Sequence, residues 1–205
     1  LEQLLVNAAA SRARGIGGIK LKVGQPDQAL DIQRVEAVRK NLGDHTPLMV
    51  DANQQWDRPT AQRMCRIFEQ FNLVWIEEPL DAYDNEGHAA LAAQFDTPIA
   101  TGEMLTSAAE HAELIRHRAA DYLMPDAPRV GGITPFLRIA AQAENAGLAL
   151  GPHFAMELHV HLGAVYATEP WVEHFDWLEP LFNERLEIKS NADFNERLAT
   201  FIGNI

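Results

Sequence analysis

The stretch Ile19-Lys20-Leu21-Lys22-Val23-Gly24 sets a pattern that recurs along the chain. A short strand-like run carries charged side chains near its end, and a stretch with apolar residues at helical spacing follows it. The next example is Leu48-Met49-Val50-Asp51, which precedes a helix predicted to start near Asp57 and Pro59. Continuous apolar runs are typical of strands that are covered on both faces. We therefore expect repeated βα units around a parallel sheet.

The predicted strands are short and separated by predicted amphipathic helices. They cover residues 16–23, 48–50, 73–76, 98–101, 122–124, 148–150 and 171–177. Helix starts are expected at Asp27, Asp57, Thr106 or Ser107, and Thr134, because capping side chains or prolines precede apolar faces there.

Polar side chains end these strands at intervals of 20 to 29 residues. They are Lys22, Asp51, Glu77, Glu103, Asp126, His153 and Glu173. In a barrel the carboxyl ends of the strands form one ring, which is where barrel enzymes carry out chemistry. No phosphate-binding glycine motif follows a predicted strand, which disfavours an open doubly wound sheet. We therefore predict an α/β fold of the (β/α)8 TIM-barrel type.

Composition narrows the classes of function. The 205 residues contain 17 Lys and Arg against 29 Asp and Glu, a net charge of −12. This balance argues against binding to nucleic acid or an anionic membrane, and no apolar run reaches the ~18–20 residues of a membrane span. The single cysteine, Cys65, excludes an internal disulfide and a cysteine-based zinc site. A cytoplasmic setting is expected.

Three acids on successive strands, Asp51, Glu77 and Glu103, form an all-oxygen set that suits Mg²⁺. The simpler alternative is that each acid caps a helix, but three at near-constant spacing favour a metal site. Lys20 and Lys22 lie beside them and point the same way on their strand. We expect these two ammonium groups to depress each other's pKa, so that Lys22 can act as a base.

Asp126 and His153 lie on the other side of the predicted ring. A carboxylate bonded to one ring nitrogen leaves the other free for proton transfer, although a merely satisfied buried histidine is the simpler alternative. Glu173 could form a hydrogen bond to an oxyanion if its pKa is raised. His159 and His161 suggest a zinc or binuclear hydrolase instead, but residues two apart in a helix diverge.

Taken together, these motifs resemble the mandelate racemase group of the enolase superfamily, in order and spacing, from about residue 1 to about residue 188. The phrases are Ile19-Lys20-Leu21-Lys22-Val23-Gly24, Val50-Asp51-Ala52-Asn53, Trp75-Ile76-Glu77-Glu78-Pro79, Gly102-Glu103, Met124-Pro125-Asp126, Gly131-Gly132-Ile133-Thr134 and Pro152-His153. Within that group, residues 126–132, 152–157 and 169–175 look most like the galactarate and L-talarate dehydratases.

The resemblance implies a modified (β/α)7β barrel and a Mg²⁺-dependent lyase that dehydrates a small acid sugar. It implies these roles: Mg²⁺ ligands Asp51, Glu77 and Glu103; acid/bases Lys22 and His153 on opposite faces; Asp126 orienting His153; Glu78 supporting the ligands; substrate contacts Lys20, Asn53, His153 and Glu173. Loss of the α-proton gives an enediolate, and loss of the β-hydroxyl as water then gives a 3-deoxy-2-keto acid.

Alternatives stay open beside this interpretation. A racemase or epimerase of a 2-hydroxy acid uses the same two bases, and assembly into a homo-oligomer is not decided by the sequence. The resemblance places a capping domain and the first barrel strand before Leu1. We therefore expect Lys20 and Lys22 on an edge strand, and a catalytically weak fragment is the further alternative.

The predicted domain division is a partial barrel over residues 1–188 and an unassigned tail over residues 189–205. The resemblance is lost after Glu187, where the five residues Phe-Asn-Glu-Arg-Leu at 182–186 recur at 194–198.

Overall fold

Strands and helices alternate along the chain as the sequence predicts, in a computed structural model that describes residues 1–181, 183 and 200–204. The strands are β1 (Gly18–Lys22), β2 (Leu48–Asp51), β3 (Ile76–Glu77), β4 (Ile99–Thr101), β5 (Tyr122–Leu123), β6 (Ala149–Leu150), β7 (Trp171–His174) and β8 (Thr200–Asn204). The α-helices are α1 (Glu2–Ala13), α2 (Gln28–Leu42), α3 (Arg58–Phe68), α4 (Asn85–Gln94), α5 (Ala108–Arg116), α6 (Ile133–Asn145) and α7 (Met156–Gly163). Two 3-10 helices are η1 (Glu69–Phe71) and η2 (Asp176–Leu181).

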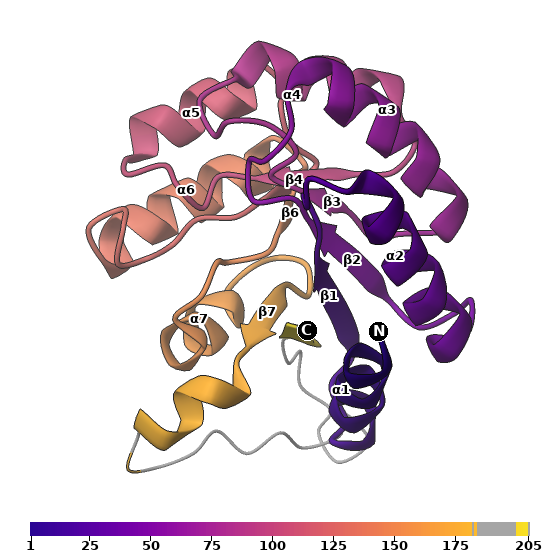
Figure 1. Ribbon diagram of the computed structural model, residues 1–205. Helices are drawn as coiled ribbons and strands as arrows, with labels where there is room; N and C mark the ends of the chain where they lie inside the picture. The colour runs from indigo at the N-terminus through magenta and orange to yellow at the C-terminus, as the bar shows by residue number, and fades with distance from the viewer. Residues whose placement is uncertain (182, 184–199, 205) are drawn as a thin grey trace.

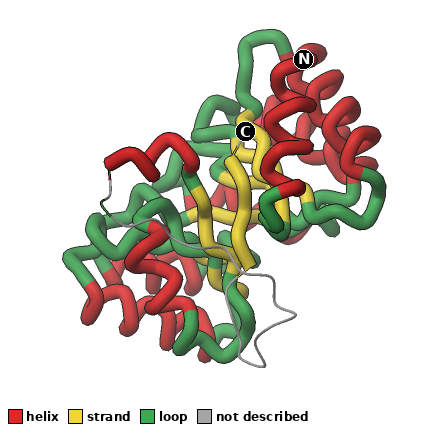
Figure 2. Tube along the Cα trace, turned by 90° about the horizontal axis from the view of Figure 1, so that it is seen from below, coloured by secondary structure: helices red, strands yellow, loops and turns green. Residues whose placement is uncertain are grey.

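The strands form one parallel sheet in the order β6-β5-β4-β3-β2-β1-β8-β7. Figure 1 shows the strands at the centre of the molecule with the helices around the outside. Figure 2, turned by 90°, shows the strands running through the middle between two groups of helices. This arrangement confirms the predicted barrel-type α/β fold.

Strand β8 corrects one expectation from the sequence. It pairs with β1 on one side, with Gly18 opposite Ile202, and with β7 on the other, with Glu173 opposite Ile202. Strand β1 therefore lies between β2 and β8, and the expectation that Lys20 and Lys22 lie on an open edge is wrong. The rest of the predicted tail, including the second copy of the five-residue motif at 194–198, lies outside the described residues, so the domain boundary stays a prediction.

Helices α2, α3 and α5 begin where capping side chains satisfy free backbone N–H groups. Asp27 accepts from Ala29 and Leu30 at the start of α2, and Asp57 accepts from Thr60 at the start of α3. Ser107 accepts from Glu110 at the start of α5. Each of these caps contributes about 1 kcal/mol. These starts match the sequence expectation.

Side chains alternate across the strands and so divide into an outer and an inner set. On β1, Ile19 and Leu21 are fully buried in the core that also holds Val35 and Val38 of α2. Lys20, between them, faces the acids at the centre of the barrel. An apolar layer of Met49, Trp75, Ala100 and Met124 fills the interior. Burying each of the larger of these side chains contributes about 1.5–3 kcal/mol. The barrel is thus packed, and polar groups gather at the strand ends.

The last predicted strand is shorter than the sequence indicated. Residues 171–177 were expected to be extended, but β7 ends at His174 and η2 follows it. The Phe175 N–H donates to Met156 Sδ at 3.5 Å rather than to a neighbouring strand, which is why the ladder stops there. Within the described residues, the structure contains no helix with the length and apolar character needed to cross a membrane.

Candidate active site

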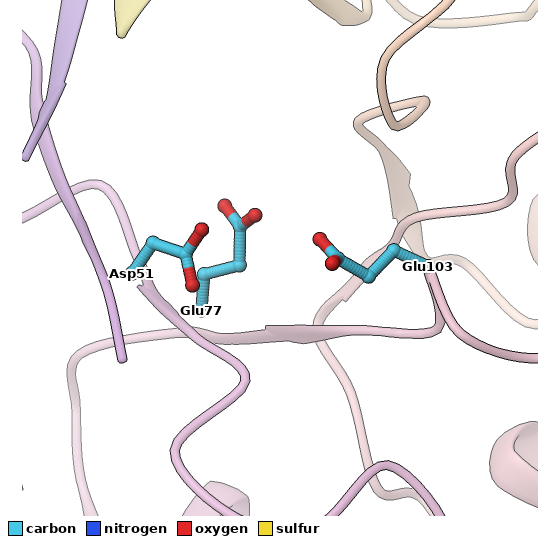
Figure 3. A group of neighbouring side chains, drawn as sticks. All are labelled: Asp51, Glu77 and Glu103. Atoms are coloured by element: carbon cyan, nitrogen blue, oxygen red, sulfur yellow. The ribbon is translucent and has the colours of Figure 1, made fainter. Parts of the chain in front are cut away.

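Three buried carboxylates converge at the carboxyl ends of neighbouring strands. Asp51 ends β2, Glu77 ends β3, and Glu103 follows β4 after one glycine. One oxygen from each lies within 4.8 Å of the others. Figure 3 shows Asp51 and Glu77 side by side, with Glu103 reaching toward them from across the site. Their predicted convergence is therefore confirmed. The caps of the helices that follow are other residues, which sets aside the simpler alternative.

Two lysines of β1 contact these acids from one side. Lys20 is fully buried, and its Nζ lies 2.6 Å from Glu77 Oε1, 2.6 Å from Glu173 Oε1 and 3.7 Å from Asp51 Oδ2. Lys22 Nζ donates to Asp51 Oδ2, while its side chain is 47% exposed. The two lysines thus differ in burial, and Lys22 reaches the open end of the barrel.

The acids around Lys20 override the expected effect of its neighbouring lysine. Burial by itself lowers the pKa of an ammonium, but Glu173, Glu77 and Asp51 together raise the pKa of Lys20 well above its usual value. The expectation that the two lysines depress each other's pKa is therefore wrong for Lys20, which is held as a cation.

The carboxylates of the site differ in the direction in which burial and neighbouring charges shift their pKa. Burial raises the pKa of Glu77 well above its ordinary value, and the nearby Asp51 adds to the shift. Burial and Glu103 raise the pKa of Glu78 to about 8. The pKa of Asp51 is lowered because Lys20 and Lys22 outweigh the effect of its burial.

This donor set fits a hard divalent cation. All the converging atoms are carboxylate oxygens, which Mg²⁺ prefers. Glu103 Oε2 is buried and has no hydrogen-bond partner among the described residues. A buried, unpartnered carboxylate oxygen is costly unless a cation or a donor reaches it. A cation bound between the three acids would meet that need.

A histidine–aspartate pair flanks the opposite end of the trio. His153 Nδ1 lies 2.9 Å from Asp126 Oδ2, and His153 Nε2 lies 3.6 Å from Glu103 Oε2. The Arg129 N–H donates to the second Asp126 oxygen at 3.0 Å. The pKa of Asp126 is lowered because these hydrogen bonds outweigh the effect of burial. An ionised Asp126 must accept from Nδ1, so Nε2 of His153 is the nitrogen that faces the site.

Glu173 on β7 is held by two donors. Its Oε1 accepts from Lys20 at 2.6 Å, and its Oε2 accepts from the backbone N–H of Phe154. The pKa of Glu173 is lowered because Lys20 outweighs its burial. The raised pKa that a protonated, donating Glu173 requires is thus not found.

Several supporting residues were missed from the sequence. Trp75 Nε1 donates to Glu77 Oε2 at 2.9 Å, and Gln54 Nε2 donates to Glu78 Oε2 at 2.6 Å. Trp75 stands two residues before Glu77, so strand alternation was a usable signal. Asn53 was expected to contact the substrate, and its backbone N–H donates to Asp51 Oδ1 at 2.9 Å, a contact that the sequence did not predict.

The histidines of α7 do not form a second metal site. His159 is fully buried, and both ring nitrogens face backbone atoms of the chain, whereas His161 is exposed. Among the described residues, the group with the geometry of a metal site is the carboxylate trio. His159 and His161 therefore do not supply the ligands that a zinc hydrolase would need.

Comparison with known proteins identifies the family of the chain. The model of the family described as "Enolase C-terminal domain-like" matches residues 3–197. The chain belongs to this family. The predicted resemblance to the enolase superfamily is thus confirmed.

Individual relatives are similar over most of the chain. The L-talarate/galactarate dehydratase of Salmonella typhimurium is 67% identical over 189 residues, which are 92% of this chain and 48% of that protein. The structure of L-talarate dehydratase from Polaromonas sp. JS666, complexed with Mg and L-glucarate, is 84% identical with a TM-score of 0.89. The match covers 92% of this chain and 53% of the Polaromonas chain. The chain spans about half the length of these relatives.

Proposed function

We propose that this chain provides the catalytic barrel of a Mg²⁺-dependent acid-sugar dehydratase of the galactarate/L-talarate type. The observation that carries the proposal is the carboxylate trio with Lys22 at one end and the His153–Asp126 pair at the other. The activities of the similar dehydratases support it, as does the Mg in the complex of the Polaromonas enzyme with L-glucarate.

Asp51, Glu77 and Glu103 would hold the Mg²⁺. When bound, the ion would neutralise the charge that develops on the substrate carboxylate as its α-proton leaves. Lys20 would keep a buried positive charge beside that carboxylate, because its own acidic neighbours hold it protonated. Burial strengthens this electrostatic effect, since few water molecules screen it.

Proton transfers would take place at two atoms on opposite sides. Lys22 Nζ would take the α-proton, which leaves the substrate as an enediolate. His153, protonated at both nitrogens, would then give its Nε2 proton to the β-hydroxyl, which leaves as water. Asp126 stabilises the charged ring and fixes its orientation. The enol that results would ketonise to a 3-deoxy-2-keto acid.

The proposal is tested by following 2-keto acid formation from galactarate, L-talarate and mandelate in the presence of Mg²⁺. We expect keto-acid formation from the aldarates by the unchanged chain. His153→Asn should abolish it, because asparagine cannot deliver the proton, while Mg²⁺ binding measured by calorimetry should persist. His45→Asn, at an exposed histidine, is the matched control and should keep full activity.

Other outcomes separate the alternatives. Exchange of the α-hydrogen with solvent deuterium, without keto-acid formation, would favour a racemase or epimerase. Dehydration at the unchanged rate by His153→Asn would refute the role assigned to His153. No reaction with any of these acids, despite Mg²⁺ binding, would contradict the dehydratase proposal for this chain.

A further inference from the structure

His159, on α7, connects the two loops that carry the histidine–aspartate pair. Its Nε2 lies 3.1 Å from the backbone nitrogen of Ala127, directly after Asp126. Its Nδ1 lies 3.1 Å from the backbone oxygen of Phe154, directly after His153. The imidazole is fully buried and stacks on Phe136 of α6, with the ring centroids 5.3 Å apart.

These two partners determine the state of the ring. A backbone N–H can only donate and a carbonyl can only accept, so Nε2 must accept and Nδ1 must carry the proton. The imidazole is therefore neutral. Burial likewise lowers the pKa of His159, in agreement with this assignment.

The loop after His153 needs such an attachment. Phe154 and Ala155 have φ angles of 60° and 20°, which side-chain-bearing residues rarely adopt. Strained backbone of this kind persists only where surrounding contacts fix it. At Phe154 the N–H is bound by Glu173 and the carbonyl by His159, so both sides of the residue next to His153 are held.

We propose that His159 is a positioning residue. Its neutral ring connects the Ala127 backbone to the Phe154 backbone by hydrogen bonds and so keeps Asp126 and His153 at hydrogen-bonding distance from each other. His159 does not touch the reacting atoms. It acts through the other two residues, and the catalytic part of this inference rests on the proposed function. A small displacement of the pair matters, since about 1 Å of misplacement can cost about 100-fold in rate.

Two substitutions separate the hydrogen bonds from the packing. His159→Phe keeps a ring beside Phe136 but removes both hydrogen bonds. His159→Gln keeps an acceptor at the position of Nε2 and restores the bond to Ala127. His88→Phe is the matched control. His88 is equally buried, but its Nδ1 bonds the carbonyl of Asp84, directly before its own helix α4, and its Nε2 has no hydrogen-bond partner among the described residues.

The first measurement is nuclear magnetic resonance of the chain with labelled histidine. The His153 Nδ1 proton should give a downfield signal typical of a hydrogen bond to a carboxylate, assigned by its loss in Asp126→Asn. We expect this signal in the unchanged chain, in His159→Gln and in His88→Phe, but not in His159→Phe. In the unchanged chain, the nitrogen shifts of His159 should show Nδ1 protonated and Nε2 unprotonated at pH 6–8.

The second measurement is the kinetics of aldarate dehydration. We expect kcat to fall about 10- to 100-fold in His159→Phe, with KM changed much less and with recovery in His159→Gln. Protonation of His159 at Nε2, or an unchanged downfield signal in His159→Phe, would overturn the positioning role even if that variant folded poorly in other respects. The expected signals without any dehydration would leave the positioning role standing and count against the proposed function instead.

Discussion

Replacing Lys20 with methionine removes the ammonium that lies between Glu77 and Glu173 but keeps a side chain of similar length. Lys20 Nζ lies 2.6 Å from a carboxylate oxygen of each, and all three residues are buried. In Lys20→Met these oxygens lose their cation without gaining water. The free energy of unfolding should therefore fall.

The size of the loss follows from the burial of the contacts. Removing one partner of a buried ion pair costs about 3–5 kcal/mol, because the other charge stays buried and unpaired. For a chain of this length, each 1 kcal/mol lowers the melting temperature by about 2–4 °C. We therefore expect Lys20→Met to melt about 6–20 °C below the unchanged chain at neutral pH in the absence of Mg²⁺.

The measurement is unfolding by heat and by urea, followed by circular dichroism. Lys40→Met removes an exposed lysine near the end of α2 and is the control. Surface substitutions of this kind usually stay within about 0.5 kcal/mol of the original stability. A Lys20→Met variant that also stayed within that range would refute the inference that Lys20 balances the buried acids.

Three further outcomes are expected. The pKa of Glu173 is lower in the folded chain than its unfolded value of about 4.3, so its pairing with Lys20 stabilises the fold above that pH. This stabilisation is lost as the pH falls through the lower folded pKa. The stability deficit of Lys20→Met, measured by urea titration, should therefore shrink below about pH 4. Saturating Mg²⁺ should raise the melting temperature of the unchanged chain and of the control Asp96→Asn but not of Glu103→Gln. At a Mg²⁺ concentration about 100 times the dissociation constant, the free energy of unfolding should rise by about 2.7 kcal/mol. An equal rise in Glu103→Gln would contradict the metal site. Burial, with a smaller effect of Glu69, raises the pKa of the Cys65 thiol to about 12, so a thiol reagent at pH 8 should label it only in denaturant, and rapid labelling of the folded chain would show that α3 opens readily.

The positions of the site side chains were predictable because they follow from strand alternation. Asp51, Glu77 and Glu103 follow one another at intervals of 26 residues in sequence, yet the carboxyl ends of adjacent parallel strands lie at one edge of the sheet. A polar residue at the end of each apolar run therefore reaches the same place. The charge of Lys20 was harder to predict, since its pKa depends in part on Glu173, which lies 153 residues further along the chain.

Backbone donors in the site could not be read from the sequence. The N–H of Asn53 supports Asp51, and the N–H of Phe154 supports Glu173. Every residue except proline has the same N–H, so composition gives no sign of which one is used. What selects them is local conformation, here φ angles of 44° and 60°, and such conformations depend on contacts with other elements.

Strand β8 was missed for a related reason, and it bears directly on the site. Parallel pairing joins distant segments, and nothing in the five residues Thr200–Asn204 indicates which strands they pair with. Gly203 permits close packing there, because an added Cβ would lie 3.2 Å from both Ile16 and Ser11. With β8 on one side and β2 on the other, β1 has Lys20 paired opposite both Asn204 and Met49. The two lysines of the site are therefore held on an interior strand, whose neighbours fix the direction from which their amines approach the acids.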